Sequence, residues 1–293
     1  MTPTPPPEQG AVLLGTGAQV TTAVPTAHEA VLGATPGAGA LWWRVAEYWL
    51  IVYRRTWQGS VISGFLSPLL YIAAMGYGLG GLVDRSGGPE GVPYVQFIAP
   101  GVLAANAMTL AVGEATYPVM GAIKWMRNYH AMLATPLGVA DLVLGHLGYL
   151  VLRVAAVSAV FLAVGTALGA FRSVWALGAL GVAVLCGAAH TPVVMAFTGR
   201  LENESSGFNL LFRFGLVPMF LFAGTFFPVD QLPAVLRPLA WVTPLWHATA
   251  AARDLSLGHV SPGPLAGHLA YLLLWCGVGL WLAVLSLRRR LVE

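Results

Sequence analysis

Six apolar runs restrict the fold of this chain more than any other feature of its sequence. A helix of about 20 apolar residues crosses the hydrocarbon core of a bilayer, and these runs lack the alternation of barrel strands. With 57% hydrophobic and only 9% charged residues among 293, the chain is predicted to be an all-α polytopic membrane protein with six transmembrane helices. The predicted spans lie near residues 58–81, 94–118, 139–169, 174–198, 208–226 and 264–287.

The segment before the first span mixes tryptophan and tyrosine with arginine. Residues 41–57, LWWRVAEYWLIVYRRTW, place Arg44, Glu47, Arg54 and Arg55 away from the aromatic side chains on a helix. This composition predicts an N-terminal interfacial amphipathic helix in the headgroup region. The plainer alternative is that it forms the flank of the first span. Residues 1–40, rich in Pro, Thr, Ala and Gly, are predicted to be a disordered tail.

The segment between the fifth and sixth spans, residues 227–262, is apolar but contains several prolines. Pro228, Pro233, Pro238 and Pro244 break it too often for one transmembrane helix. We expect two short re-entrant helices that enter the outer leaflet, with protein or water around their irregular backbone.

The basic residues predict how the chain is oriented. One set of connections holds ten arginines and lysines and the other holds four. The positive-inside rule therefore predicts a multi-pass protein of the cytoplasmic membrane with both termini in the cytoplasm and segment 227–262 outside. The ten are Arg44, Arg54, Arg55, Lys124, Arg127, Arg200, Arg213 and Arg288–Arg290, and the four are Arg85, Arg172, Arg237 and Arg253.

The connection between spans two and three, GAIKWMRNYHAMLATPL (Gly121–Leu137), is the most polar interruption in the hydrophobic middle of the chain. Ile123, Met126 and Leu133 recur at helical spacing, and Pro136 ends the pattern. This predicts a short amphipathic helix over residues 121–135, a coupling helix that docks on an ATPase; an ordinary solvated loop is the alternative. The residues predicted to make that contact are Lys124, Met126, Arg127, Asn128 and His130.

Motifs for nucleotide or metal chemistry do not emerge from the sequence. A phosphate-binding loop needs a lysine followed by Ser or Thr, whereas the only lysine, Lys124, precedes a tryptophan. The glycines of Gly76–Gly81 follow an apolar span, which favours helix packing. Cys186 and Cys276 lie inside separate apolar runs and make no metal site. We expect no catalytic residues, no metal and no cofactor on this chain, and no nucleic-acid partner.

Two charged residues fall inside predicted spans. Glu114 lies in the second span and Arg153 in the third, and intramembrane charges are costly enough to suggest function. They can pair with each other, Arg153 can extend to the headgroups, or both can line a substrate path. His190, beside Pro192, is interpreted as a packed histidine.

Four stretches of the chain resemble the integral-membrane permeases of type-2 ABC exporters, the ABC-2 family, over about Trp42–Leu257. The resemblance is strongest to the NodJ-like lipo-oligosaccharide and daunorubicin-resistance-type branch. The fourth stretch is the most specific, because FFPVDQLP, PLWH and the later Arg253 occur in family order. The tail of about 40 residues is longer than the family leads us to expect. The stretches are Ser67–Val83, Tyr94–Pro118, Met132–Leu147 and Phe220–Leu255.

The resemblance implies a fold and a mechanism. Such permeases have six spans, an interfacial helix, a coupling helix and re-entrant helices. They work as homodimers on separate ATPase subunits, which bind ATP and Mg²⁺. They export amphipathic substrates, here a lipid-linked oligosaccharide or glycolipid, or a hydrophobic drug. The family positions of the re-entrant segment are Phe227, Pro228, Leu232, Pro233, Pro244, His247 and Arg253.

Two other classes of protein are compatible with a polytopic chain. A membrane enzyme acting on lipids would use residues such as Glu114, His190 or His247 converging on one cavity. An ion-coupled secondary transporter would usually show internal repeats, and no convincing repeat relates the two halves of this chain. The ABC-permease interpretation also explains why the chain has no nucleotide motif, which neither alternative addresses.

Overall fold

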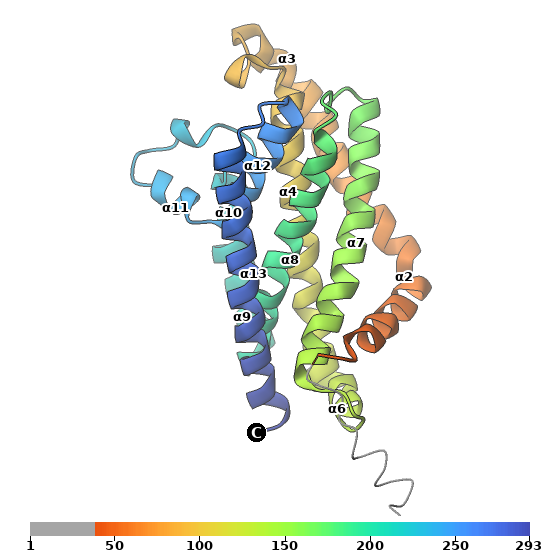
Figure 1. Cartoon of the computed structure of the whole chain (residues 1–293). Coiled ribbons are helices and arrows are strands. Elements are labelled where there is room, and N and C mark those ends of the chain that lie inside the picture. The colour runs from red at the N-terminus through yellow and green to blue at the C-terminus, as the bar shows by residue number, and fades with distance from the viewer. Residues whose placement is uncertain (1–38) are drawn as a thin grey trace, which may run out of the picture. The chain divides into compact units, whose positions relative to one another are not determined.

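Five long apolar helices run between the two ends of the described bundle (Figure 1). The computed structural model describes the backbone of residues 39–293, and their side chains apart from those of residues 56–65, 67–69, 71 and 86. The predicted tail therefore lies almost wholly outside the described residues. In the described part every regular element is helical and no strand occurs. The five are α4 (Tyr94–Ala115, continued to Trp125), α7 (Val139–Ala167), α8 (Ala176–Arg200), the α9–α10 span (Glu204–Phe222) and α13 (Pro262–Leu291).

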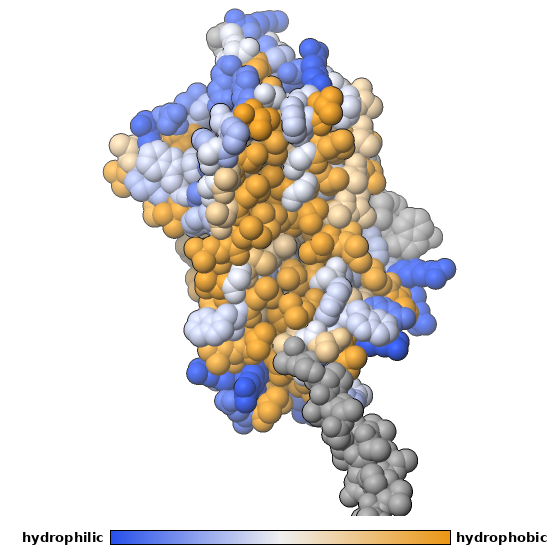
Figure 2. All heavy atoms as spheres, viewed as in Figure 1, coloured by the Kyte–Doolittle hydropathy of each residue, from blue (hydrophilic) through white to orange (hydrophobic). Residues whose placement is uncertain are grey.

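Helices α4 and α8 form the centre of the bundle. Helix α4 contacts α7, α8 and α12 (Pro244–Leu257), and α8 also contacts α13. In its apolar stretch α4 is 78% buried within the bundle, whereas the α9–α10 span is only 11% buried. Figure 2 shows hydrophobic side chains across the middle of the visible face and hydrophilic ones gathered toward its ends. This pattern suits a bundle surrounded by lipid.

The N-terminal helix differs from the predicted arrangement. Helix α2 (Trp42–Tyr71) continues through residue 57, where the sequence predicted a change from interfacial helix to span, and Figure 1 shows it bending along its course. A π-helical segment, Ile72–Leu79, and α3 (Gly80–Val83) follow. The chain passes from one end of the bundle, where Leu41 N donates to Asp141, to the other, where Tyr94 N donates to Asp84. Whether this segment crosses the membrane as the predicted first span, near residues 58–81, stays a prediction.

The predicted coupling helix over residues 121–135 is wrong as a single helix. After α5 (Tyr117–Met120), Gly121–Trp125 forms a π-helical turn, and α6 covers only Asn128–Leu133. Arg127 lies between them with φ 55°, in the left-handed region that L-residues seldom adopt. The helical spacing of Ile123, Met126 and Leu133 therefore does not form one face, because the backbone reverses its twist at Arg127.

The segment before α13 contains the two short helices that its prolines predicted. Helix α11 (Arg237–Trp241) and α12 each begin with a proline in the first turn, where the missing N–H costs nothing. A 3₁₀ turn, Val229–Gln231, precedes them, and two more, Asp84–Ser86 and Pro89–Gly91, join α3 to α4. Helix α12 packs against α4, α8 and α13. The depth of these helices in a membrane stays a prediction.

Candidate functional site

The connection between α4 and α6 exposes large side chains at the end of the bundle that also carries the C-terminal arginines. We call Trp125, Met126 and Arg127 the tip; Trp125 and Met126 are 55% and 61% exposed. Lys124 beside it bonds within the chain, because its Nζ lies 2.8 Å from Glu204 Oε2 at the start of α9. The predicted contact of Lys124 with the ATPase stays a prediction. The ion pair connects the tip directly to the α9–α10 span.

An aromatic junction joins α2 and α6 to α7 behind the tip. Trp49 of α2 is buried, stacks on Tyr149 and meets the rings of Tyr129 and His146 edge-on. Tyr129 belongs to α6, and its neighbour Asn128 donates a 2.7 Å hydrogen bond to Tyr48 of α2. In the structure Asn128 holds α6 to α2, and its predicted contact with the ATPase stays a prediction. Any displacement of the tip therefore acts on α2 and α7 as well.

Two glycines of α7 permit this close approach of α2. A Cβ on Gly145 would lie 2.5 Å from Trp42 O, and a Cβ on Gly148 would lie 2.7 Å from the Trp42 ring. Of the charged residues predicted for the interfacial helix, Arg44 and Glu47 form an exposed ion pair of 3.5 Å, and Arg54 and Arg55 are also exposed. The apolar side of the helix thus faces α7 and its charges face outward.

Glu114 and Arg153 meet above the junction. Glu114 Oε1 lies 2.5 Å from Arg153 Nη1, which also donates to Tyr149 Oη at 3.0 Å. The Arg153 side chain is only 8% exposed, and its guanidinium lies over the Tyr53 ring at 4.8 Å. Of the alternatives that the sequence left open, the structure forms the ion pair, since a buried guanidinium needs a counter-charge.

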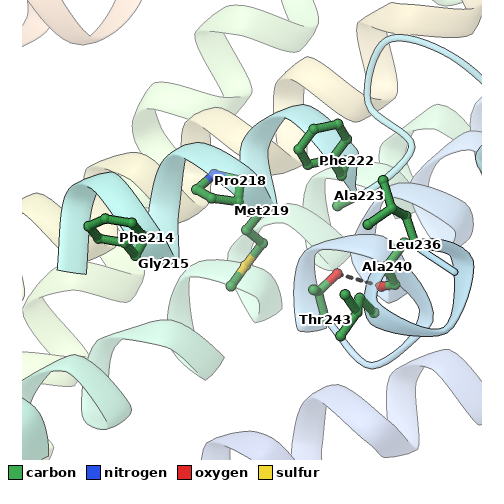
Figure 3. Close-up of a pocket in the computed structure, with 10 residues that line it drawn as sticks. Phe214, Gly215, Pro218, Met219, Phe222, Ala223, Leu236, Ala240 and Thr243 are labelled. Carbon is green, nitrogen blue, oxygen red and sulfur yellow. Dashed lines mark hydrogen bonds between the residues drawn. The ribbon is translucent and has the colours of Figure 1, made fainter. Parts of the chain in front are cut away.

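The α9–α10 span carries a hollowed apolar surface. At its far end a groove of about 420 Å³ lies between the span and α11, lined by Phe214, Pro218, Met219 and Phe222 on one side. Figure 3 shows these four along the span, with Leu236, Ala240 and Thr243 facing them. A second, shallower hollow of about 300 Å³ includes Phe214 and the residues Ser206, Asn209, Leu210 and Arg213. The two hollows share Phe214 and so follow one side of the span.

Aromatic contacts between described residues fasten both ends of this span to neighbouring segments. Phe208 meets Tyr117 of α5 near the tip, with ring centroids 4.7 Å apart, and Phe220 meets Phe226 at the far end. Between them Leu211–Leu216 is π-helical, and Phe214 is 74% exposed. Exposed apolar side chains on a membrane span face lipid by default, so the two hollows beside Phe214, rather than its exposure, distinguish this side as a candidate site.

Arg253 fastens the irregular chain between α10 and the 3₁₀ turn. Residues 223–226 are buried with non-helical backbone, and their carbonyls need donors. Arg253 donates to Gly224 O at 2.6 Å and to Phe97 O of α4 at 3.2 Å, and Tyr94 Oη donates to Phe226 O. Burial lowers the pKa of Arg253 to about 10, opposed by the carboxylates of Glu90 and Asp254, so it is charged at neutral pH.

The other polar candidates have separate local partners. His247 of α12 lies with its Nδ1 2.8 Å from His268 Nδ1 and stacks on Tyr271. His190 Nδ1 lies 2.7 Å from the Cys186 carbonyl within α8, as a packed histidine does. His130, the remaining residue predicted for the coupling contact, is half-buried on α6. Phe227, Pro228, Leu232, Pro233 and Pro244 all lie in the chain around α11 and the start of α12.

Sequence reasoning missed three residues that the structure brings into these sites. Glu204 follows Arg200 and Glu202 in a short polar connection, where nothing in the sequence indicates that it meets Lys124, 80 positions earlier. Trp49 and Tyr149 were visible as aromatic residues, but their stacking depends on how α2 packs on α7. A search for carboxylates near the ends of predicted spans would have found Glu204 as a candidate.

A bundle of long apolar helices with an exposed tip at one end and a broken, buried segment at the other is that of a multi-pass membrane protein. Residues 39–257 match the family described as ABC-2 type transporter, and the chain belongs to that family. It is accordingly a membrane component of an ABC transporter, and membership implies an ATPase partner.

Several relatives have descriptions in keeping with this family. The chain is 32% identical over 260 residues to "Nodulation protein J" of Rhizobium leguminosarum bv. trifolii. This alignment covers 89% of this chain and 97% of that protein. It is 31% identical over 252 residues to "Nodulation protein J" of Rhizobium meliloti (strain 1021), covering 83% and 94%. It is 24% identical over 211 residues to "Inner membrane transport permease YadH" of Escherichia coli (strain K12), covering 70% and 78%.

Proposed function

We propose that this chain is the transmembrane half of an exporter that moves an amphipathic molecule outward across the cytoplasmic membrane. The substrate is a lipid-linked oligosaccharide or glycolipid, or a hydrophobic drug. ATP and Mg²⁺ bind to a separate ATPase subunit, against which the tip rests, and both termini of the chain face the cytoplasm. The likeness to nodulation proteins favours the lipid-linked sugar.

The contacts around the tip support a route for the motion. A push on Trp125 and Met126 acts through the Lys124–Glu204 ion pair on the α9–α10 span, and through the aromatic junction on α2 and α7. The shift that such a route can produce in the transport path is limited by a free-energy difference. This is the difference in how strongly the ATPase binds the tip with and without ATP.

The positions of the π-helical segments agree with this route. They lie at Ile72–Leu79 after α2, at Gly121–Trp125 beyond α4, and at Leu211–Leu216 in the α9–α10 span. π-Helical turns are uncommon and frequently occur at functional sites. Two of them belong to the segments predicted as spans one and five, and the third belongs to the segment predicted as the coupling helix, directly after span two.

The hollowed side of the α9–α10 span is the observation on which this function mainly rests. An amphipathic substrate needs an apolar surface that leads from one end of the bundle to the other, and the two hollows sharing Phe214 supply it. We propose that two copies of the chain form a homodimer in which these sides face each other. The substrate then passes between the two copies.

A crosslinking experiment tests the homodimer and its face together. Phe214→Cys, in a background with both native cysteines replaced by alanine, is expected to form a disulfide-linked dimer in native membranes. Trp281→Cys is the matched control, since Trp281 of α13 is similarly exposed, at 66% against 74% for Phe214. Equal crosslinking at both positions, or none at Phe214, would contradict the proposed face.

Hydrolysis by the co-purified ATPase tests the export reaction. The complex in nanodiscs is expected to hydrolyse ATP faster when glycolipid or drug is added, and charge reversal at Lys124 and Arg127 is expected to reduce that response while the chain still inserts. A particle that retains no ATPase under gentle conditions would contradict the proposal and favour a membrane enzyme. Against that enzyme, Glu114, His190 and His247 each have a different partner in the structure.

A further inference from the structure

A small polar cavity opens at the far end of the bundle, apart from the apolar groove. Its volume is about 180 Å³. Since a water molecule takes about 30 Å³ of liquid, the cavity has room for one ring-sized group rather than for a whole substrate. The side chains that determine its chemistry are Glu90, Asp230, Trp241, Trp246, Arg253 and Asp254.

The cavity combines charges of both signs. Arg253 is only 8% exposed, and its Nε and Nη2 donate to backbone carbonyls. Its Nη1 makes no hydrogen bond with the described residues, so this atom can donate to a group that enters the cavity. The carboxylates of Glu90, Asp230 and Asp254 supply acceptors beside it. The lining thus places a guanidinium donor beside three carboxylate acceptors, a combination that a group with many hydroxyls satisfies because each hydroxyl both donates and accepts.

Two indole rings supply the remaining surface of the cavity. Trp246 is held in place because its ring meets His247 and His268 edge-on, at centroid distances of 4.8 and 5.2 Å. Trp241, at the end of α11, is 45% exposed. Indoles bury apolar area on rigid planes, and the C–H face of a sugar ring is the apolar surface that a hydroxyl-rich ligand offers to such a plane.

Helix α11 also separates this cavity from the apolar groove. Leu239 and Ala240 line the groove, and the next residue, Trp241, lines the cavity. A molecule with an acyl chain and a sugar can therefore place each part in a matching surface within one helical turn. A hydrophobic drug without sugar would use the groove alone.

We infer that this cavity binds one glycosyl unit of the exported molecule at the extracytoplasmic end of the path. The inference rests on the proposed export function and selects the glycolipid over the drug as substrate. In this arrangement the carboxylates accept from sugar hydroxyls, Arg253 Nη1 donates to a sugar oxygen, and Trp241 covers the ring.

Saturation-transfer NMR on the permease–ATPase complex in nanodiscs tests the inference. The probes are neutral trisaccharides of glucose and of N-acetylglucosamine. The wild-type complex is expected to bind at least one of them. Because a hydrogen bond to a charged group contributes about 1.5–3 kcal/mol, Glu90→Gln is expected to weaken Kd about tenfold or more. Trp241→Ala is expected to abolish saturation transfer from the indole. Both residues are exposed, so these variants are expected to fold.

Matched controls separate this inference from the proposed function. Trp175→Ala removes an exposed tryptophan outside the cavity, 60% exposed, and Glu202→Gln removes an exposed carboxylate outside it; both are expected to bind as wild type. Equal binding by Trp241→Ala and wild type, no trisaccharide binding by wild type, or tighter binding of phosphoethanolamine than of sugar would overturn the inference. Export itself is tested separately, because loss of the ATPase from the complex would overturn the proposed function whatever the NMR shows.

Discussion

Removing the Glu114 carboxylate is the sharpest test of how the centre of this bundle is held together. In Glu114→Gln the Arg153 guanidinium, 8% exposed, would lose the negative charge of the carboxylate whose Oε1 lies 2.5 Å from its Nη1. Removing one partner of a buried ion pair costs about 3–5 kcal/mol. Glu114 is 21% exposed and Tyr149 still accepts a hydrogen bond from Arg153, so we expect the lower end, about 3 kcal/mol.

The double variant Glu114→Leu with Arg153→Met separates charge from packing. Replacing both members of a buried pair by apolar residues is commonly neutral or stabilising, so the double variant is expected to be no more than about 1 kcal/mol less stable than wild type, whereas Glu114→Leu alone and Arg153→Met alone are each destabilised. Equilibrium unfolding in mixed micelles measures all four proteins of the cycle. Glu47→Gln is the control, since its exposed pair with Arg44 is expected to contribute about 1 kcal/mol or less.

Three outcomes of this cycle can be told apart. If the double variant is as unstable as the single ones, the energy does not lie in the ion pair and the argument from burial is wrong. If the double variant is stable and still exports, Glu114 and Arg153 are structural. If it is stable but inactive, the pair lies on the substrate path.

Three further perturbations follow from contacts in the structure. Gly145→Ala is expected to destabilise the docking of α2 by about 1–3 kcal/mol, as overpacking does, measured by unfolding in mixed micelles. Lys124→Glu is expected to reduce substrate-stimulated ATP hydrolysis, and adding Glu204→Lys is expected to restore it, because the pair is internal. Burial and the neighbouring His268 lower the pKa of His247 from 6.5 to about 4. Between these values the unfolded chain takes up a proton that the folded chain does not, so stability falls as pH drops from 6.5 to 4. His247→Gln is expected to flatten that part of the pH dependence of unfolding.

Each of these expectations has a control or a contradicting result. Gly181→Ala on α8 meets no atom within 4 Å and is expected to be neutral or slightly stabilising; equal losses at both glycines would argue against the close packing of α2. Failure of Glu204→Lys to restore hydrolysis would mean that Lys124 contacts the ATPase after all. An unchanged pH slope in His247→Gln would show that other groups titrate in that range.

The sequence alone determined the class of fold and the place of most elements. An apolar run must become a helix in lipid because its backbone has no other partner there, so five of the predicted spans occur as helices close to their predicted bounds. The prolines of segment 227–262 likewise predicted two short helices, because each ring removes a donor and restricts the residue before it. Both effects depend on residues that are close together in the sequence, so a local sequence pattern is enough to predict them.

Contacts between distant segments were decided only by the tertiary structure. For Glu114 and Arg153 the sequence allowed an ion pair, extension of Arg153 to the headgroups, or a place on the substrate path. The ion pair depends on α4 and α7 lying side by side. Nothing in the sequence indicates that Lys124 has a partner within the chain, whereas in the structure it pairs with Glu204, 80 positions later. The periodicity of residues 121–135 predicted a helix that the left-handed backbone at Arg127 breaks. Pairings of this kind depend on which helices share a face, and hydrophobic periodicity carries no information about that choice because lipid and a neighbouring helix satisfy an apolar side chain equally well.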